Sequence, residues 1–197
     1  LHDFLSELRK KRSFEEIFLL PYRFSKAIDT SISNEKIIAL CAASVLGWVS
    51  YTVFDDCMDE EEYSEQALPL AMACHRMMTA LFLTTIDDSS FQNTFESTMN
   101  KLDEAQAWEM ETARKKIPGT QCSEFSCFSD THQVGHKSYG HMLSCIGQLY
   151  LDKNQDTTTI HAFITFFHHY LVARQLNDDA HDVREDLEAG HISFVVS

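Results

Sequence analysis

The chain is built from long segments whose apolar positions show no strand-like alternation, and no hairpin-type turn pair separates them. Only three prolines and six glycines occur among 197 residues. This scarcity favours long helices with few tight turns. A chain of this length can bury a sizeable core, so we expect an all-α fold in a single domain over residues 1–197.

Two helix starts in the first part of the chain carry clear signals. Residues 13–16 (SFEE) form a capping box that begins an early helix, and Pro21 is expected to kink or end that helix. Asn34 is expected to cap the next helix. This second helix continues through residues 37–54, a run without a charged side chain, into the acidic sequence DDCMDEEE.

The remainder of the chain predicts four more helices separated by polar breaks. The expected helices cover residues 70–85, residues 91–116, residues 131–151 and residues 157–189. The expected breaks lie at Ser64 and Pro69, at 87–90, at 118–130 and at 152–156. Gly190 occupies a C-terminal cap position after the last helix.

Charge and cysteine content narrow the class of protein. The net charge of −14 argues against a nucleic-acid-binding face, and an anionic substrate would need a cation beside it. The six cysteines form no CxxC pair and lie mostly in apolar helical context, which favours a reduced, cytoplasmic setting. Residues 1–12 are mixed and charged, so no signal peptide is expected.

The uncharged run 37–54 reaches the lower length limit of a membrane span. It contains Ser44, Gly47, Ser50, Tyr51 and Thr52 and leads directly into an acidic cluster. A helix buried on all sides of a bundle explains the run more simply, so we expect no transmembrane segment.

Two clusters of aspartates share the spacing i, i+1, i+4, which places the first and last members on one helical face. The first acidic motif is Asp55, Asp56 and Asp59, and the second acidic motif is Asp178, Asp179 and Asp182, with Glu185 as a fourth carboxylate. A charge run is usually a solvated face. Here each cluster extends an apolar helix, and Trp48 and Tyr51 lie upstream of the first motif.

Carboxylates at this density repel one another unless a cation lies between them. Oxygen ligands select hard cations, so we expect Mg²⁺, with more than one ion, and Mn²⁺ could replace it. Two such helices facing each other would form an apolar cavity with a charged rim. An isoprenoid diphosphate, with its hydrocarbon tail and polyanionic head, has the matching chemistry.

At this point the sequence resembles the trans-prenyl diphosphate synthases and, more widely, the class I isoprenoid synthases. FDDCMD and QLNDDAHD resemble the two DDxxD motifs of that family, and Gln175 matches its FQxxDD pattern. Lys137 and Ser138 in HKSYG resemble the family's Lys-Thr pair, and DLEAGHIS resembles its DxxxGK stretch with His191 in place of lysine. The resemblance spans residues 35–193.

The resemblance implies an isoprenoid-synthase-type helical bundle around a central apolar cavity. It also implies that the two acidic motifs hold metal ions against the substrate diphosphate, and that Lys137 adds positive charge there. Trp48 and Tyr51 would face the carbocation formed on ionisation. Trp48 and Tyr51 could instead serve only to pack the core, and Lys137 could instead be an ordinary surface lysine.

Two departures from the prenyl synthase motifs bear on the choice between cyclisation and chain elongation. DEEEYSEQ follows the first motif where prenyl synthases carry RRG, and PYRFSKAI is at best a remnant of their GKRxRP stretch. Terpene cyclases need no second substrate, and Asn177, Asp178, His181 and Glu185 match their NDxx(S/T)xxxE motif except at His181. We therefore favour a terpene synthase, a lyase, over an elongating transferase that uses isopentenyl diphosphate. Lys137 and Gln175 favour the transferase.

Two further alternatives come from other classes. An HD-type phosphohydrolase would use His181-Asp182 and upstream histidines, but only fifteen residues remain for its downstream aspartate. A non-catalytic synthase-like partner subunit would explain the missing basic motifs and the short segment after the second motif. That short segment is expected in a minimal or truncated version of the family fold, and a homodimer is compatible with it.

Overall fold

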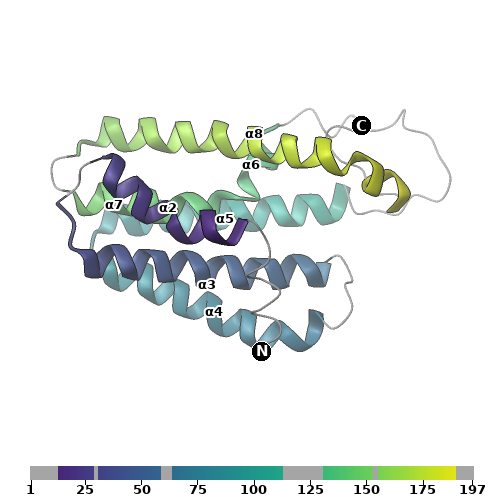
Figure 1. Cartoon of the computed structure of the whole chain (residues 1–197), viewed down its shortest axis with the longest axis horizontal. Coiled ribbons are helices and arrows are strands. Elements are labelled where there is room, and N and C mark those ends of the chain that lie inside the picture. Colours follow the sequence, from purple (N-terminus) through teal and green to yellow (C-terminus); the bar gives the residue numbers. More distant parts are fainter. Residues whose placement is uncertain (1–12, 29–30, 59–63, 113–130, 153–154, 190–197) are drawn as a thin grey trace. The chain divides into compact units, whose positions relative to one another are not determined.

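The computed structural model describes residues 13–28, 31–58, 64–112, 131–152 and 155–189 (Figure 1). Within these ranges every regular element is a helix and no β-strand occurs, which confirms the predicted all-α class. The elements are α2 (Ser13–Ala27), α3 (Asn34–Met58), α4 (Ser64–Thr85), α5 (Ser89–Thr112), α6 (Thr131–His136), the 3₁₀ helix η3 (Tyr139–Met142), α7 (Leu143–Leu151) and α8 (Thr157–Ala189).

Short polar side chains hold the starts of three long helices. The backbone N–H of Lys36 donates to the Ser33 hydroxyl at 3.5 Å, so Ser33 rather than Asn34 caps α3. Asp88 caps α5, because its Oδ1 accepts the backbone N–H groups of Ser90 and Phe91 at 2.8 and 3.0 Å. Asp156 caps α8 in the same way. These bonds satisfy donors that the first turn of a helix leaves open.

Two predicted boundaries were wrong. Pro69 does not separate helices, because α4 already begins at Ser64 and contains Pro69 inside its second turn, where a proline removes one helical hydrogen bond. The helix expected over 131–151 is interrupted at Lys137 and Ser138, between α6 and η3. Pro21 lies inside α2 and does not end it. The expected extension of α5 to residue 116 falls outside the described residues.

The chain divides into two compact units. Unit 1 comprises residues 1–95 and 140–161, and unit 2 comprises residues 96–139 and 162–197. In unit 1, α3 and α4 run side by side in opposite directions (Figure 1). They approach closely at Gly47, where a Cβ would lie 2.7 Å from the Met78 sulfur. The absence of a side chain at Gly47 therefore allows the close packing.

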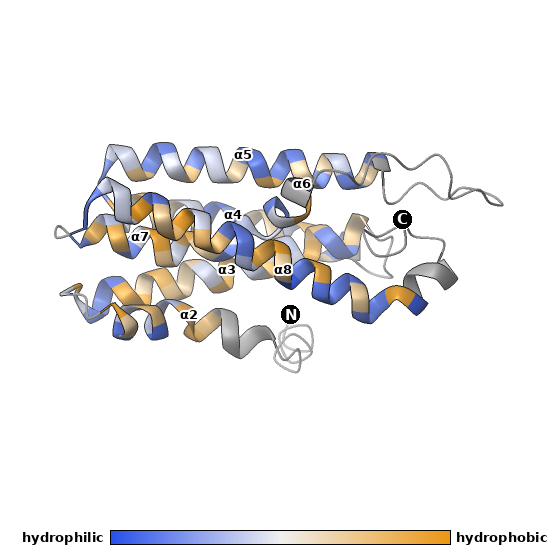
Figure 2. Ribbon diagram, turned by 90° about the horizontal axis from the view of Figure 1, so that it is seen from above, coloured by the Kyte–Doolittle hydropathy of each residue, from blue (hydrophilic) through white to orange (hydrophobic). Residues whose placement is uncertain are grey.

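An aromatic cluster fills the core of unit 1 where α4, α5 and α7 meet. The rings of Phe82, Phe91 and Phe95 lie 5.6 to 6.2 Å apart, and Tyr150 contacts Phe91 edge-on at 5.6 Å. Phe82 and Phe91 are fully buried, and each such side chain contributes about 1.5–3 kcal/mol through burial. Figure 2 shows the matching pattern, with α7 mainly apolar and α5 mainly polar.

Helix α2 is joined to α7 by a buried hydrogen bond. The Gln148 side-chain amide on α7 donates to the backbone carbonyl of Pro21 at 2.8 Å, across 127 positions of sequence. Gln148 has no solvent exposure. A buried amide without this partner would be costly, so the bond fixes which part of α2 packs on α7.

Two described helices are long and apolar enough to cross a membrane: Asn34–Met58 and Glu65–Thr85. Their most apolar 18-residue windows are 44% and 22% buried within the structure. Length and composition are the criteria here, and the core helices of a helical bundle meet them as well. The two helices are therefore weak evidence in either direction.

Candidate functional site

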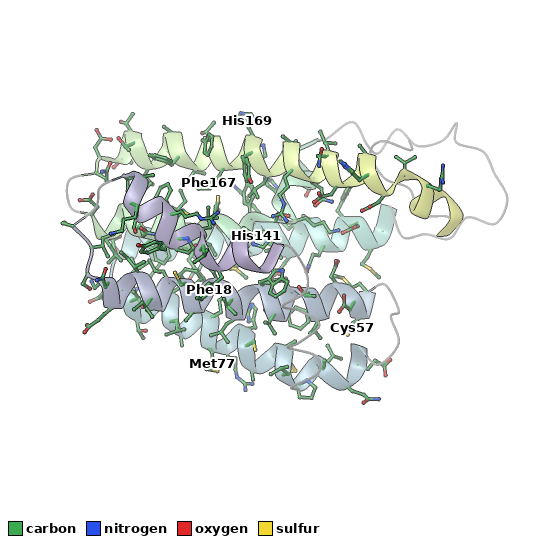
Figure 3. The ribbon with its side chains drawn as sticks, in the orientation of Figure 1. Phe18, Cys57, Met77, His141, Phe167 and His169 are labelled. Carbon is green, nitrogen blue, oxygen red and sulfur yellow. The ribbon has the colours of Figure 1, made fainter. Side chains whose placement is uncertain are left out.

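The first acidic motif begins in the last turn of α3, and its third member, Asp59, lies outside the described residues. Asp55 and Asp56 are half-buried and interact with other groups of the structure. Cys57 follows them at this end of α3 (Figure 3). The last turn of α3 contains no basic residue. The negative end of a helix dipole disfavours each carboxylate by about 0.3–1 kcal/mol, which a bound cation would offset.

The side chains upstream of the first motif pack against α4. Trp48 is half-buried and packs on the small core cluster of Val49 and Cys74. The ring of Tyr51 meets Phe54 edge-on at 5.7 Å and His75 of α4 at 5.9 Å. These contacts give both rings a packing role. The hypothesis that they also face a substrate remains a prediction.

The second acidic motif lies within α8, a helix whose bounds agree with the prediction. Asp178 and Asp182 are exposed and lie one helical turn apart, whereas Asp179 is half-buried. Nε of Arg174 lies 3.9 Å from Oδ2 of Asp178, a long ion pair between neighbouring turns. The structure therefore leaves two carboxylates of this motif open to solvent on one side of α8.

Neighbouring polar side chains support the second motif from within the helix. The side-chain amide of Gln175 donates to Oδ1 of Asp179 at 3.1 Å. Nδ1 of His181 donates to the backbone carbonyl of Asn177 at 2.7 Å. Asn177 is exposed, and the Glu185 side chain lies outside the described residues. The first bond orders the side chains of Gln175 and Asp179, and the second orders the ring of His181.

Lys137 lies in the turn between α6 and η3, in the same unit as the second motif. Its Nζ forms an ion pair with Oε1 of Glu109 on α5 at 2.6 Å. The backbone N–H of Ser138 donates to the Gly135 carbonyl and closes the turn. The half-buried pair shows that Lys137 is not a free surface lysine.

A cluster of two histidines and a tyrosine adjoins this turn, and no sequence motif indicated it. The hydroxyl of Tyr139 is hydrogen-bonded to Nδ1 of His168 on α8, and the His136 ring lies 4.5 Å from the Tyr139 ring. Burial raises the pKa of Tyr139 to about 12. The only signal in the sequence was the recurrence of histidines in HKSYG and FFHHY, which does not indicate that they meet.

The first half of α8 presents different side chains to its two sides. Phe167 is buried and His169 is exposed, and they project from opposite sides of the helix (Figure 3). His168 lies between them and reaches Tyr139. The position at which α8 contacts the α6–η3 turn, His168, therefore lies two to three helical turns before the second motif.

The donor chemistry of the acidic motifs fits a hard divalent cation, since carboxylate oxygens are the preferred ligands of Mg²⁺. Among the described residues, however, no three His, Cys, Asp or Glu side chains are grouped closely enough to hold an ion by themselves. Metal binding by either motif therefore remains a prediction. Substrate phosphates commonly complete the coordination of Mg²⁺ in such sites.

A cavity of about 530 Å³ opens at the other end of α3, far from the first acidic motif. Its lining includes Lys36 at the start of α3, Thr85 at the end of α4 and Tyr150 on α7. A rise of 1.5 Å per residue separates Lys36 from Asp55 by roughly 28 Å along α3. This cavity is not the predicted apolar pocket next to the carboxylates, and that pocket remains a prediction.

Comparison of the chain with protein-family models, with curated proteins and with solved structures finds no match.

Proposed function

We propose that the chain ionises an allylic isoprenoid diphosphate in a metal-dependent reaction and releases diphosphate, giving a terpene product. The observation that carries the proposal is the exposed pair Asp178 and Asp182, one turn apart on α8, in the same unit as the half-buried Lys137. The acidic end of α3 supports it, because Asp55 and Asp56 occupy a helix end that disfavours carboxylates.

The residues that would hold the metal are the carboxylates of both motifs, including Asp59, Asp179 and Glu185. Bound Mg²⁺ would act as a Lewis acid that neutralises charge on the departing diphosphate. Lys137 would bind a phosphate oxygen and add a fixed positive charge. Ser138, Asn177 and His181 are the neighbouring polar groups that could contact the substrate head.

The apolar part of the substrate would lie against the aromatic side chains upstream of the first motif. Trp48 and Tyr51 could stabilise a carbocation through their π faces, at about 0.5–2 kcal/mol each. Exclusion of water by these side chains would delay quenching of the cation. The product class then depends on whether the cation cyclises, loses a proton or meets a second alkene.

Chain elongation is the second candidate, favoured by Lys137 and Gln175, which match prenyl synthases. The absence of the RRG and GKRxRP residues that hold isopentenyl diphosphate favours the lyase. A partner subunit without activity would bind neither substrate productively. The three alternatives predict different products from the same incubation.

The test is incubation with Mg²⁺ and allylic diphosphates of several chain lengths, with and without radiolabelled isopentenyl diphosphate. We expect released diphosphate and a hydrocarbon or alcohol without label. Label in a longer prenyl diphosphate would assign the chain to the elongating class. Absence of turnover with every substrate would reject both catalytic proposals.

A further inference from the structure

The ion pair between Lys137 and Glu109 joins two elements of unit 2. Nζ of Lys137 and Oε1 of Glu109 are 2.6 Å apart, and the two side chains are only 22% and 17% exposed. A charge-assisted bond this short in a half-buried setting is stronger than an ordinary surface ion pair. Lys137 is therefore held by the carboxylate of Glu109.

The backbone around Lys137 is fixed from the opposite side by α8. A Cβ at Gly135 would lie 2.5 Å from Cγ2 of Val172, so α6 packs directly on α8. Tyr139 directly follows the turn, and its hydroxyl is hydrogen-bonded to Nδ1 of His168 on α8. The residues on both sides of Lys137 thus contact α8, while the head of its side chain lies at Glu109 on α5.

Carboxylate and phosphate oxygens are acceptors of the same kind for an ammonium group. A diphosphate that binds Lys137 must therefore share the ammonium with Glu109 or displace Glu109. Glu109 also carries a like charge to the incoming anion, which opposes binding beside it.

We propose that Glu109 is a latch that holds Lys137 in place of a diphosphate and releases it when diphosphate binds. This inference rests on the proposed function for its ligand, and it makes Glu109 a positioning residue that acts through Lys137. A latch keeps the lysine ordered while the site is open, and it sets the affinity for the anionic head lower than the lysine alone would. The opposite arrangement, a permanent brace that aims Lys137 at the phosphate, would make Glu109 necessary for binding.

Binding of inorganic diphosphate with Mg²⁺, measured by titration calorimetry, separates these two roles. Glu109→Gln keeps the size of the side chain and removes its charge. We expect this variant to bind diphosphate roughly fivefold more tightly, the ratio that corresponds to loss of one competing ion pair. Glu104→Gln removes the same charge from an exposed position of α5 and should leave the affinity unchanged. Glu109→Asp keeps the charge and should remain close to the wild-type chain.

The Lys137→Met background shows whether the effect passes through the lysine. We expect Lys137→Met to weaken diphosphate binding and to abolish the gain caused by Glu109→Gln. An equal gain in both backgrounds would mean general charge repulsion and would overturn the latch. Unchanged or weaker binding by Glu109→Gln would overturn it in favour of a brace, and failure of every variant to bind diphosphate would overturn it altogether.

The unaltered chain gives an independent readout if Glu109→Gln does not fold. The carboxyl ¹³C resonance of Glu109 should shift when diphosphate is added, and that of Glu104 should not. A static Glu109 resonance at saturating diphosphate would overturn the latch. Turnover of an allylic diphosphate is assayed separately, so its absence alongside an intact binding cycle would reject the proposed function and leave the latch standing.

In an active enzyme, the latch predicts a split between the kinetic constants. Glu109→Gln should lower KM for the diphosphate substrate and slow product release, while a structural defect would lower kcat without lowering KM. Equal melting temperatures of Glu109→Gln and Glu104→Gln would show that the fold is unaffected.

Discussion

The hydroxyl of Tyr139 and Nδ1 of His168 lie 2.5 Å apart, and their hydrogen bond fastens the turn that carries Lys137 to α8. Tyr139 is 4% exposed. Among the described residues, His136, His168 and Lys101 face its ring, and Nζ of Lys101 lies 5.9 Å from the ring centre. The attachment of the candidate diphosphate-binding lysine thus depends on a buried phenol.

Stability should fall at alkaline pH because of this phenol. Burial raises the pKa of Tyr139 from 10.0 to about 12, so the unfolded chain loses this proton first. The contribution of protonated Tyr139 to the free energy of unfolding is complete below pH 10. It is lost as the pH rises through about 12, and the free energy of unfolding falls by roughly 2–3 kcal/mol. Urea unfolding at a series of pH values from 9 to 12 measures the loss.

Tyr139→Phe should be less stable at neutral pH by about 1 kcal/mol and should lack this alkaline component. Tyr170→Phe, at an exposed tyrosine of α8, is the control and should behave as the wild-type chain. Burial also raises the pKa of Cys145 to about 12, so Cys145→Ala is needed to subtract its share. An alkaline loss of full size in Tyr139→Phe would contradict the assignment.

Removal of a carboxylate from the acidic end of α3 should raise the stability of the metal-free chain and abolish its activity. Asp55→Asn should stabilise the metal-free chain by about 0.3–1 kcal/mol, because it removes a negative charge from the C-terminal turn. The same substitution should abolish turnover, as should Asp55→Ala and Asp178→Ala, with helix content intact. Thermal melting without metal and a diphosphate-release assay give the two readouts.

Glu35→Gln is the matched control for this helix. Glu35 lies in the first turn of α3, where a carboxylate is favourable, so its loss should destabilise the chain by a similar amount. Normal activity of Asp55→Asn would remove the first acidic motif from the proposed site. A destabilised Asp55→Asn would show that its present contacts outweigh the helix dipole.

Tyr51→Ala should enlarge the space one turn above Asp55 and admit a substrate one isoprene unit longer. Loss of its contacts with Phe54 and His75 should also cost stability, at most about 3 kcal/mol because the ring is only half-buried. Relative rates on two substrate lengths, measured with the melting temperature, test both parts.

His75→Ala is the control for Tyr51, since it removes the partner on α4 and leaves the tyrosine in place. It should lower stability without changing the preferred chain length. If Tyr51→Ala is destabilised and keeps the same chain-length preference, the ring belongs to the core and not to a pocket.

Two glycines lie at close contacts between helices, and these contacts should differ in how well they tolerate an added methyl group. Gly135→Ala would place a Cβ 2.5 Å from the branched Val172 side chain and 3.4 Å from its backbone nitrogen. Gly47→Ala would meet only the flexible Met78 side chain, at 2.7 Å. We expect Gly135→Ala to cost about 1–3 kcal/mol and to weaken diphosphate binding through Lys137, with Gly47→Ala less affected in both. Equal losses in the two variants would contradict this ranking.

The helices could be predicted where local signals determine them. The bounds of α8 follow from Asp156 at its start and from an uninterrupted helical sequence up to Ala189. The break at Lys137 and Ser138 could not be predicted, because it accompanies the packing of Gly135 on Val172, 37 positions away in sequence. No local sequence signal encodes such a tertiary contact.

In the candidate site, too, some features follow from local sequence and others depend on tertiary contacts. The spacing of Asp178 and Asp182 on one face of a helix follows from periodicity and is present in α8. The partner of Lys137 does not follow from any motif, because Glu109 lies on another helix 28 positions earlier. Resemblance to a family indicated the lysine, and only the folded chain brings the glutamate to it.

Unit 1 is assembled from two separate pieces of chain, and this has a consequence for its synthesis on the ribosome. Phe91 and Ile86 pack against Gly147, and Pro21 receives its hydrogen bond from Gln148. The first piece ends at Phe95, and the second is not complete until His161. At about 5–20 residues per second, the nascent first piece waits several seconds with its aromatic core uncovered. The newly made chain should therefore be a client of ribosome-associated chaperones during that interval.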